Sequence, residues 1–166
     1  YHIVYHNVYG LKTVSLRLTN TYGPRMRVKD ARQTFLGWWL RQIVAGQILQ
    51  VFGDGQQIRD FNYVDDVVMA LLLAAQHDQA DGQIYNLGAP EAVNLIELAE
   101  ILLSIVGHGE YEIVPFPNSR KRIDIGDYHG SYRKIERELN WTPQTNLQDG
   151  LKQTVTFYQE NLAHYI

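Results

Sequence analysis

The sequence contains no cysteine in its 166 residues. Disulfide bonds, zinc–thiolate sites and catalysis by a thiol are therefore excluded. There is also no large excess of charge of one sign, because 15 lysines and arginines are balanced by 18 aspartates and glutamates, for a formal net charge of −3. A chain with this balance and no run of like charges is not expected to bind nucleic acid or an anionic membrane surface as its main partner.

Long apolar stretches are absent as well. No segment approaches the roughly 20 apolar residues that a membrane-spanning helix needs, and the N-terminus lacks the charged head and apolar core of a signal peptide. We therefore expect a cytoplasmic protein with no membrane partner. The first residue is Tyr1 and not Met, which indicates either a missing start or a piece of a larger protein.

Motifs that mark complete catalytic sites are also missing. There is no G-x-G-x-x-G or G-x-x-G-x-x-G phosphate-binding loop, no P-loop, no Tyr followed four residues later by Lys, and no G-x-S-x-G elbow. The six histidines are scattered along the chain. We therefore predict no catalytic residue and no metal site in these residues.

Hydrophobic periodicity predicts a mixed α/β chain with too few strands to close a large sheet alone. Helices are expected over residues 1–10, 33–45, 64–77, 95–106, 131–139 and 147–162. Strands are expected over 13–18, 48–52, 84–87 and 111–116, the first mostly buried, and residues 19–26 are expected to form a loop. Gly10 is a predicted C-cap, and Asn94 with Glu97 is a predicted capping box.

The polar residues that lie in loops or at strand ends favour recognition of an anion. They are Asn20, Arg59, Asn86 and the triplet Arg120-Lys121-Arg122. The planar fork of arginine suits phosphate oxygens, and an asparagine amide can bind a diphosphate or a sugar hydroxyl. Asp124, two residues after the triplet, is placed either to orient a guanidinium or to accept a ribose hydroxyl.

Four segments together resemble extended short-chain dehydrogenases/reductases that act on nucleotide sugars, the NAD-dependent epimerase/dehydratase family. The segments are LRLTNTYGPRM (16–26), VFGDGQQIRDFNYVDDVVMALLLA (51–74), IYNLGAPEAVNLIELAEIL (84–102) and KIERELNWTPQTNLQDGLKQTVTFY (134–158). They follow the family's order and span nearly the whole chain. The family includes UDP-glucose 4-epimerases, dTDP-glucose 4,6-dehydratases and UDP-glucuronate decarboxylases.

The resemblance implies a fold of two parts, of which this chain matches only the second half of the family. Residues 1–24 would be the C-terminal tail of an NAD-binding Rossmann-type domain, and residues 25–166 a small mixed α/β domain that binds the nucleotide-diphosphate sugar. The family's Gly-rich loop and its Tyr-x-x-x-Lys pair would lie before Tyr1. NAD is therefore the cofactor implied for the parent enzyme, and binding of NAD by this chain alone is not expected.

The resemblance also implies roles for individual residues. Asn20 and Arg59 match residues that contact the substrate diphosphate, and Asn86 matches an asparagine near the base and ribose. The backbone of Leu18 and Thr19 matches the part of the family that approaches the nicotinamide. The matches expected to line the base pocket, or to meet the substrate through backbone amides, are Val51, Phe52, Thr34, Phe35 and Leu36.

A late Arg-x-x-Asp pair in the family lies at the phosphate and ribose, and Arg122 with Asp124 resembles it. The spacing in this sequence is one residue shorter, which leaves Lys121 or Arg120 as alternative counterparts. Arg59 has a second interpretation too, as a structural residue that ties its loop to an aspartate, Asp54 or Asp60.

Tyr1, Tyr5 and Tyr9 lie on one face of the first predicted helix, which is a packing or dimerisation face. The resemblance implies that this helix joins subunits of a homodimer or a higher oligomer. A strand at 13–18 without the rest of its sheet would expose backbone groups. An isolated chain is therefore expected to oligomerise, to exchange elements, or to rearrange residues 1–12.

The main hypothesis is an enzyme part: the substrate-binding half of an NAD-dependent nucleotide-sugar epimerase or dehydratase, inactive alone. Epimerase is the preferred label, because R-D-F after G-D-G fits epimerases and dehydratases better than decarboxylases. The alternative is a stand-alone nucleotide-sugar-binding or dimerisation module without catalysis. A third possibility is a fragment that folds and binds nothing. The identity of the nucleotide and of the sugar stays open.

Overall fold

The computed structural model describes residues 1–30, 34–117, 121 and 124–166. Its helices are α1 (His2–Tyr9), α2 (Phe35–Val44), α3 (Val64–Gln76), α4 (Leu95–Val106), α6 (Arg133–Leu139) and α7 (Leu147–Asn161), with 3-10 turns η1 (Asp78–Ala80) and η2 (Leu162–His164). Its strands are β1 (Ser15–Arg17), β2 (Asn20–Tyr22), β3 (Leu49–Phe52), β4 (Ile58–Tyr63), β5 (Ile84–Asn86), β6 (Ala92–Asn94) and β7 (Tyr111–Val114). The mixed α/β prediction is confirmed.

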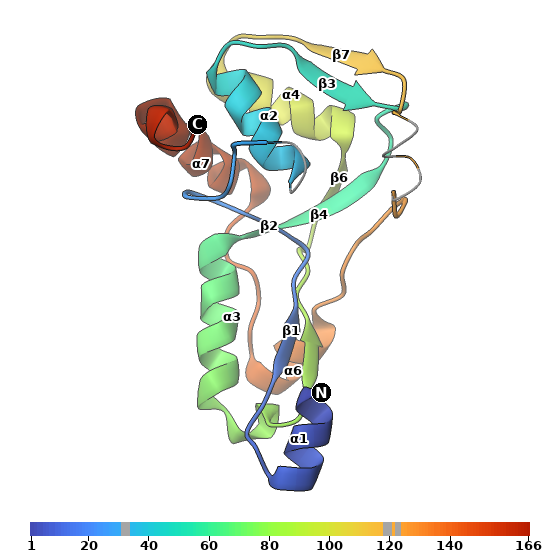
Figure 1. Cartoon of the computed structure of the whole chain (residues 1–166), viewed down its shortest axis with the longest axis vertical. Coiled ribbons are helices and arrows are strands. Elements are labelled where there is room, and N and C mark those ends of the chain that lie inside the picture. Colours follow the sequence, from blue (N-terminus) through green and yellow to red (C-terminus); the bar gives the residue numbers. More distant parts are fainter. Residues whose placement is uncertain (31–33, 118–120, 122–123) are drawn as a thin grey trace.

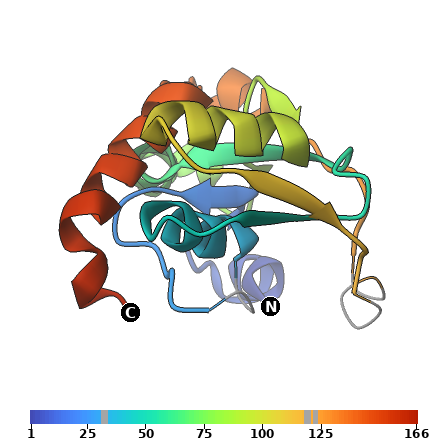
Figure 2. The ribbon, with the colours of Figure 1, turned by 90° about the horizontal axis from the view of Figure 1, so that it is seen from above.

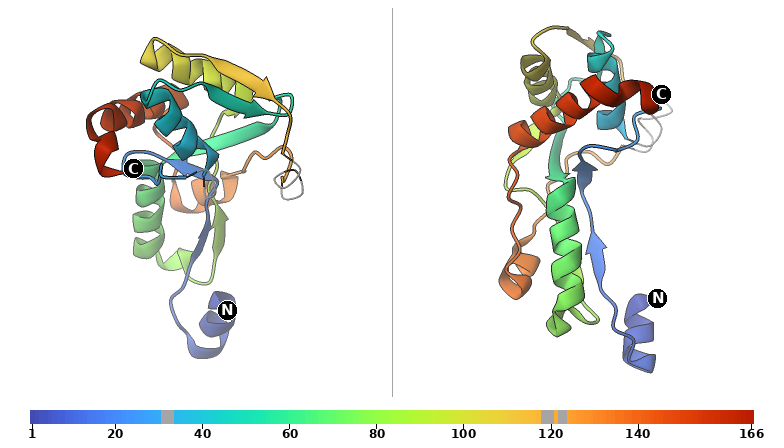
Figure 3. Two further views of the ribbon diagram at one scale, coloured as in Figure 1. Left: turned by 45° about the horizontal axis from the view of Figure 1, so that its top comes forward. Right: turned by 90° about the vertical axis from the view of Figure 1, so that its left-hand side faces the viewer.

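The molecule has two lobes that meet at strands β2 and β4 (Figure 1). The upper lobe of Figure 1 holds α2, α4 and α7 around β3, β4, β6 and β7, and Figure 2 shows these elements from above. The lower lobe holds β1 and β5, with α3 and α6 beside them and α1 at its end (Figures 1 and 3).

Each lobe has its own hydrophobic core. The core of the upper lobe includes Trp39, Leu40 and Leu98 among its buried side chains, and the core of the lower lobe includes Tyr85 and Ile135. Burial of these side chains supplies the main driving force for folding. The site-bearing segments described below run between the two cores.

Strand β4 is paired on both of its edges, each over a different half. Its first half, Ile58 to Asp60, is antiparallel to β6, with Arg59 opposite Val93. Its second half is parallel to β2, with Asn20 opposite Phe61. The other pairs, β1 with β5 and β3 with β7, are both parallel.

The predicted helices and their caps agree well with the structure. Gly10 ends α1 with a φ of 66°, in the left-handed region that glycine adopts without strain. At the start of α4, the Glu97 amide donates to Asn94 Oδ1 at 2.8 Å, and the Asn94 amide donates to Glu97 Oε2 at 2.9 Å. The predicted capping box is therefore confirmed.

Three local predictions are wrong. Residues 19–26, expected to be a loop, contain β2, and β4 and β6 were not expected as strands at all. The first strand was expected to be mostly buried, but none of its three residues is buried. Strands β2, β4 and β6 lack the alternation of apolar and polar residues that predicts a strand. They are recognised only from their pairing with strands that are distant in the sequence.

Helix α1 buries none of its residues. Its exposed apolar side chains are Ile3, Val4, Tyr5, Val8 and Tyr9. Helix α3 also carries exposed apolar side chains, among them Met69 at 51% and Leu72 at 50% exposure. Within the described residues, no helix combines the length and the apolar character needed to cross a membrane. The domain boundary expected at residue 24 stays a prediction, and β1 pairs across it with β5.

Candidate functional site

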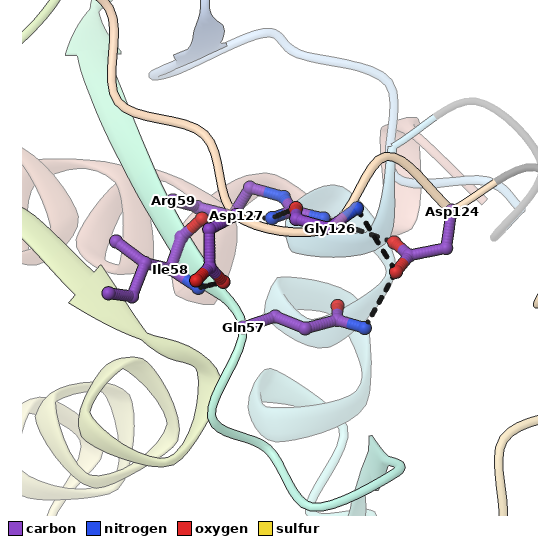
Figure 4. A network of polar contacts seen from close by, with 6 residues as sticks. All are labelled: Gln57, Ile58, Arg59, Asp124, Gly126 and Asp127. Atoms are coloured by element: carbon purple, nitrogen blue, oxygen red, sulfur yellow. Dashed lines mark hydrogen bonds and ion pairs between the residues drawn. The ribbon is translucent and has the colours of Figure 1, made fainter.

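The segment 124–130 lies along the first half of β4 and is bonded to it through main-chain groups (Figure 4). The Ile58 amide donates to Asp127 Oδ1 at 2.9 Å, and the Tyr128 amide donates to the Ile58 carbonyl at 3.0 Å. Ile58 thus uses both of its backbone polar groups on this segment. The side chain of Gln57 adds a bond from Nε2 to Asp124 Oδ2 at 2.9 Å.

Arg59 is a buried arginine whose guanidinium reaches this segment (Figure 4). Its Nη1 donates to the Ile58 carbonyl at 2.8 Å and to the Gly126 carbonyl, and its Nη2 lies 3.2 Å from Asp124 Oδ1. The side chains of Arg59 and Asp124 are only 9% and 22% exposed. Sequence reasoning offered Asp54 or Asp60 as the carboxylate that ties Arg59 to its loop, and the structure gives Asp124 instead.

Thr19 and Asn20 approach the same strand from β2 and the residue before it. The Thr19 hydroxyl donates to Asn62 Oδ1 at 2.9 Å, and Asn20 Nδ2 donates to the Asp60 carbonyl at 2.9 Å. The predicted diphosphate residue Asn20 and the predicted cofactor residue Thr19 are therefore both hydrogen-bonded to β4, the strand that carries Arg59. Leu18, which precedes them, is 49% exposed.

Asp60 is a buried carboxylate that sequence reasoning did not assign to the site. It is 0% exposed, and its Oδ2 accepts from the Gly130 amide at 3.0 Å and from the Ala89 amide at 3.3 Å. Burial raises the pKa of Asp60 above the ordinary value, and these two hydrogen bonds, its own backbone amide and His129 offset part of that effect. The R-D-F motif contains Asp60, but nothing in the motif shows its distant partners.

The other predicted site residues are more dispersed. Phe35, at the start of α2, places its ring 6.2 Å from that of Phe61 on β4, and Thr34 precedes it as the N-cap. Phe52 stacks 5.9 Å from Phe116, between β3 and the end of β7. Val51 and Leu36 are buried in the upper core, at 0% and 3% exposure, so any contact with a ligand would use their backbone.

Two further candidates complete the set. Asn86 is exposed at the end of β5, opposite Arg17 of β1. Arg122 and Arg120 lie outside the described residues, and Lys121 is exposed. The structure thus gathers Thr19, Asn20, Arg59 and Asp124 around β4 and leaves the remaining candidates at its periphery.

His2 and His6 are four residues apart on α1, a spacing that can hold a metal ion on a helix. In the structure His6 Nδ1 lies 2.9 Å from the Leu11 carbonyl, and His2 Nδ1 lies 3.5 Å from the Thr13 hydroxyl. Among the described residues there is no group of three or more side chains suited to a metal ion. These histidines therefore connect α1 to the chain that follows it.

A separate hollow of about 580 Å³ lies between β6, α4 and the start of α7. None of the predicted site residues lines it; its walls are Glu91, Ala92, Val93, Glu97, Glu100, Ile101, Ser104 and Gln148. Three carboxylates would repel a diphosphate. The hollow is therefore distinct from the arginine site on β4.

Comparisons with known proteins identify the family and the fold of the chain. The model of the "NAD dependent epimerase/dehydratase family" matches residues 1–88. A dTDP-glucose 4,6-dehydratase from Actinoplanes sp. is 35% identical over 160 residues, which are 96% of this chain and 48% of that protein. This chain spans about half the length of that relative.

Two solved structures have the same fold. A UDP-glucose 4-epimerase from Thermotoga maritima, solved with UDP-glucose, has a TM-score of 0.84 and 31% identity over 96% of this chain and 50% of its own. A dTDP-glucose 4,6-dehydratase from Streptomyces venezuelae, solved with NAD and TYD bound, has a TM-score of 0.85 and 28% identity over 99% and 49%.

The raised pKa of Asp60 predicts how stability changes with pH. Since the folded state holds this proton more tightly than the unfolded state, protonation stabilises the fold as the pH falls through the raised pKa towards about 3.9. Relative to Asp60→Asn, which does not titrate, the wild-type protein should therefore gain unfolding free energy between pH 7 and pH 4. Urea unfolding of both proteins at the two pH values measures the difference. The prediction is contradicted if the difference in unfolding free energy between the two proteins is the same at both pH values, or if the wild type loses stability relative to Asp60→Asn at pH 4.

Proposed function

Because the chain belongs to the NAD-dependent epimerase/dehydratase family, we propose that it forms the nucleotide-sugar-binding part of an NAD-dependent 4-epimerase or 4,6-dehydratase. The parent enzyme would oxidise C4 of the sugar and then epimerise it or eliminate water. The observation that carries this proposal is the buried Arg59, which is held with Asp124 and Asn20 around β4. The family resemblance implies contacts between these residues and the substrate diphosphate and ribose, which supports the proposal.

The proposed role of Arg59 is to bind the diphosphate. The side chain of Arg59 is only 9% exposed, and a guanidinium in such surroundings interacts with an anion more strongly than one in bulk water. Asp124 balances its charge in the absence of ligand and accepts a ribose hydroxyl in the complex. Binding energy from the nucleotide, remote from C4, then places the reacting carbon.

NAD would meet this chain only at Leu18 and Thr19, which follow β1. Ligands of parallel α/β sheets bind at the carboxyl ends of strands, where these residues lie. The sequence contains no Gly-rich loop to hold a pyrophosphate, so the residues present do not fit NAD by themselves. We expect the chain alone to be inactive.

The apolar surface of α1 is the proposed contact between subunits. Val4, Val8 and Tyr9 are 57%, 64% and 69% exposed, and the Tyr5 ring packs at a tilt against that of Tyr9 on the same helix, with 5.4 Å between the ring centroids. Covering such a surface is favourable because it removes apolar area from water. A homodimer or higher oligomer formed through α1 would do so.

A thermal-shift titration with UDP-glucose, dTDP-glucose and NAD, each added separately, tests the proposed ligand. A ligand at 100 times its dissociation constant adds about 2.7 kcal/mol, which raises the melting temperature of a chain of this size by roughly 5–11 °C. We expect this shift with a sugar nucleotide and none with NAD. No shift with either sugar nucleotide contradicts binding by this chain, and a shift with NAD alone overturns the assignment.

Replacing Arg59 with lysine tests the role of its planar fork. Arg59→Lys keeps the charge but loses the paired geometry, so we expect the dissociation constant for the sugar nucleotide to rise roughly tenfold. Arg41→Lys is the matched control, since Arg41 also donates to a main-chain carbonyl, that of Lys29 at 2.8 Å, from the last turn of α2. Isothermal titration calorimetry of both variants measures the dissociation constant. Equal affinities of Arg59→Lys and Arg41→Lys would refute the proposed role of Arg59.

Sedimentation velocity at low micromolar concentration tests the α1 contact. We expect the wild type to self-associate and Val4→Glu/Val8→Glu to be monomeric, because two buried carboxylates would oppose the apolar contact. Gln76→Glu, which adds a charge at an exposed position of α3, should leave association unchanged. A monomeric wild type would exclude the proposed contact.

A further inference from the structure

Asp60 connects more segments of the chain than any of the predicted ligand-binding residues. Its carboxylate accepts from the Gly130 and Ala89 amides, and its main-chain carbonyl accepts from Asn20 Nδ2. Gly130 ends the segment that carries Asp124, and Asn20 is itself a predicted diphosphate ligand. One residue of β4 is therefore bonded to three segments that are far apart in the sequence.

The chain is packed tightly at this junction. A Cβ atom on Gly88 would lie 1.9 Å from the Gly130 carbonyl oxygen, so the two main chains are in direct contact. A Cβ atom on Gly130 would lie 2.9 Å from Thr19 Cγ2 and 3.3 Å from Asp60 Oδ2. His129 adds a bond between its Nε2 and the Ala89 carbonyl at 2.8 Å. The hydrogen bonds of Asp60 thus set the position of Gly130 with little room for adjustment.

The segment from Asp124 to Gly130 is anchored at both ends by neighbouring residues of β4. Arg59 contacts the Gly126 carbonyl and Asp124 at one end, and Asp60 binds Gly130 at the other. Between them, Ile58 bonds to Asp127 and Tyr128. Loss of the hydrogen bond from Gly130 to Asp60 would release the Gly130 end of the segment. The position of Asp124 relative to Arg59 would then be less well defined.

We propose that Asp60 is a positioning residue for the nucleotide-sugar site: without touching the ligand, it fixes the segment 124–130 on β4 and so presents Arg59 and Asp124 in one geometry. This inference rests on the proposed function. The other carboxylate oxygen, Oδ1, is buried and has no hydrogen-bond partner among the described residues. An asparagine with its oxygen in place of Oδ2 would therefore keep both amide bonds.

Asp66 provides a matched control. It is also buried, at 5% exposure, and its two carboxylate oxygens accept from the Gln144 and Thr145 amides at 3.1 and 3.0 Å. The turn that it holds contains no predicted ligand-binding residue. Asp60→Ala and Asp66→Ala should both lower the melting temperature, because the first leaves the buried Ala89 and Gly130 amides without their acceptor and the second does the same to the partly buried Gln144 and Thr145 amides.

Only the Asp60 variant should affect ligand binding. With UDP-glucose or dTDP-glucose as the probe, calorimetry below the melting temperatures should show a roughly tenfold or greater loss of affinity in Asp60→Ala and an unchanged affinity in Asp66→Ala. Asp60→Asn should restore affinity to within about threefold of the wild type. Asp60→Ser, whose hydroxyl is too short to reach both amides, should behave like Asp60→Ala and serves if the alanine variant does not fold.

Hydrogen exchange without ligand separates this inference from the proposed function. The amides of Ile58 and Tyr128 should exchange at least about tenfold faster in Asp60→Ala than in the wild type or Asp66→Ala. Unchanged exchange, wild-type affinity in Asp60→Ala, or an equal loss of affinity in Asp66→Ala overturns the positioning role. If the wild type binds neither sugar nucleotide, the proposed function fails, and the role of Asp60 in ligand binding falls with it even where the exchange result holds.

Discussion

The backbone of β4 is the constraint on which the rest of the structure depends. Its first half is bonded to β6 and to the segment 124–130, and its second half is bonded to β2. Buried main-chain groups must find partners, and a strand with three different partners holds all three in register. This arrangement brings Asn20, Arg59 and Asp124 together, although they are separated by up to 104 residues in the sequence, the difference between 20 and 124.

Arg59 illustrates how a guanidinium is accommodated inside a protein. Moving a guanidinium out of water is costly unless its donors are satisfied. Here the Ile58 and Gly126 carbonyls and the Asp124 carboxylate accept from it. These contacts hold the guanidinium in one place, so the proposed binding of a diphosphate would need little further ordering of this side chain.

The sequence was informative where structure depends on nearby residues. Helical periodicity and caps, such as Asn94 with Glu97, predicted α4 almost to the residue, and four motifs indicated the family. Contacts between distant residues were not predictable in this way. The bond from Asp60 to Gly130, the pairing of β2 with β4 and the choice of Asp124 as the partner of Arg59 all depend on how remote segments meet. The roles assigned to Asn86 and Arg122 stay predictions, and Arg122 lies outside the described residues.

The contact between the main chains at Gly88 and Gly130 has a consequence for how such a protein can diverge. Elsewhere in a core, a larger side chain at one position can be compensated by a smaller one at its neighbour. A Cβ atom on Gly88 would meet main-chain atoms of Gly130, and main chain cannot be made smaller, so no second substitution can compensate for a change at Gly88. At Gly130 the nearest atom to an added Cβ is Thr19 Cγ2, at 2.9 Å, which belongs to a side chain. Divergent variants must therefore keep glycine at position 88 and have more freedom at position 130.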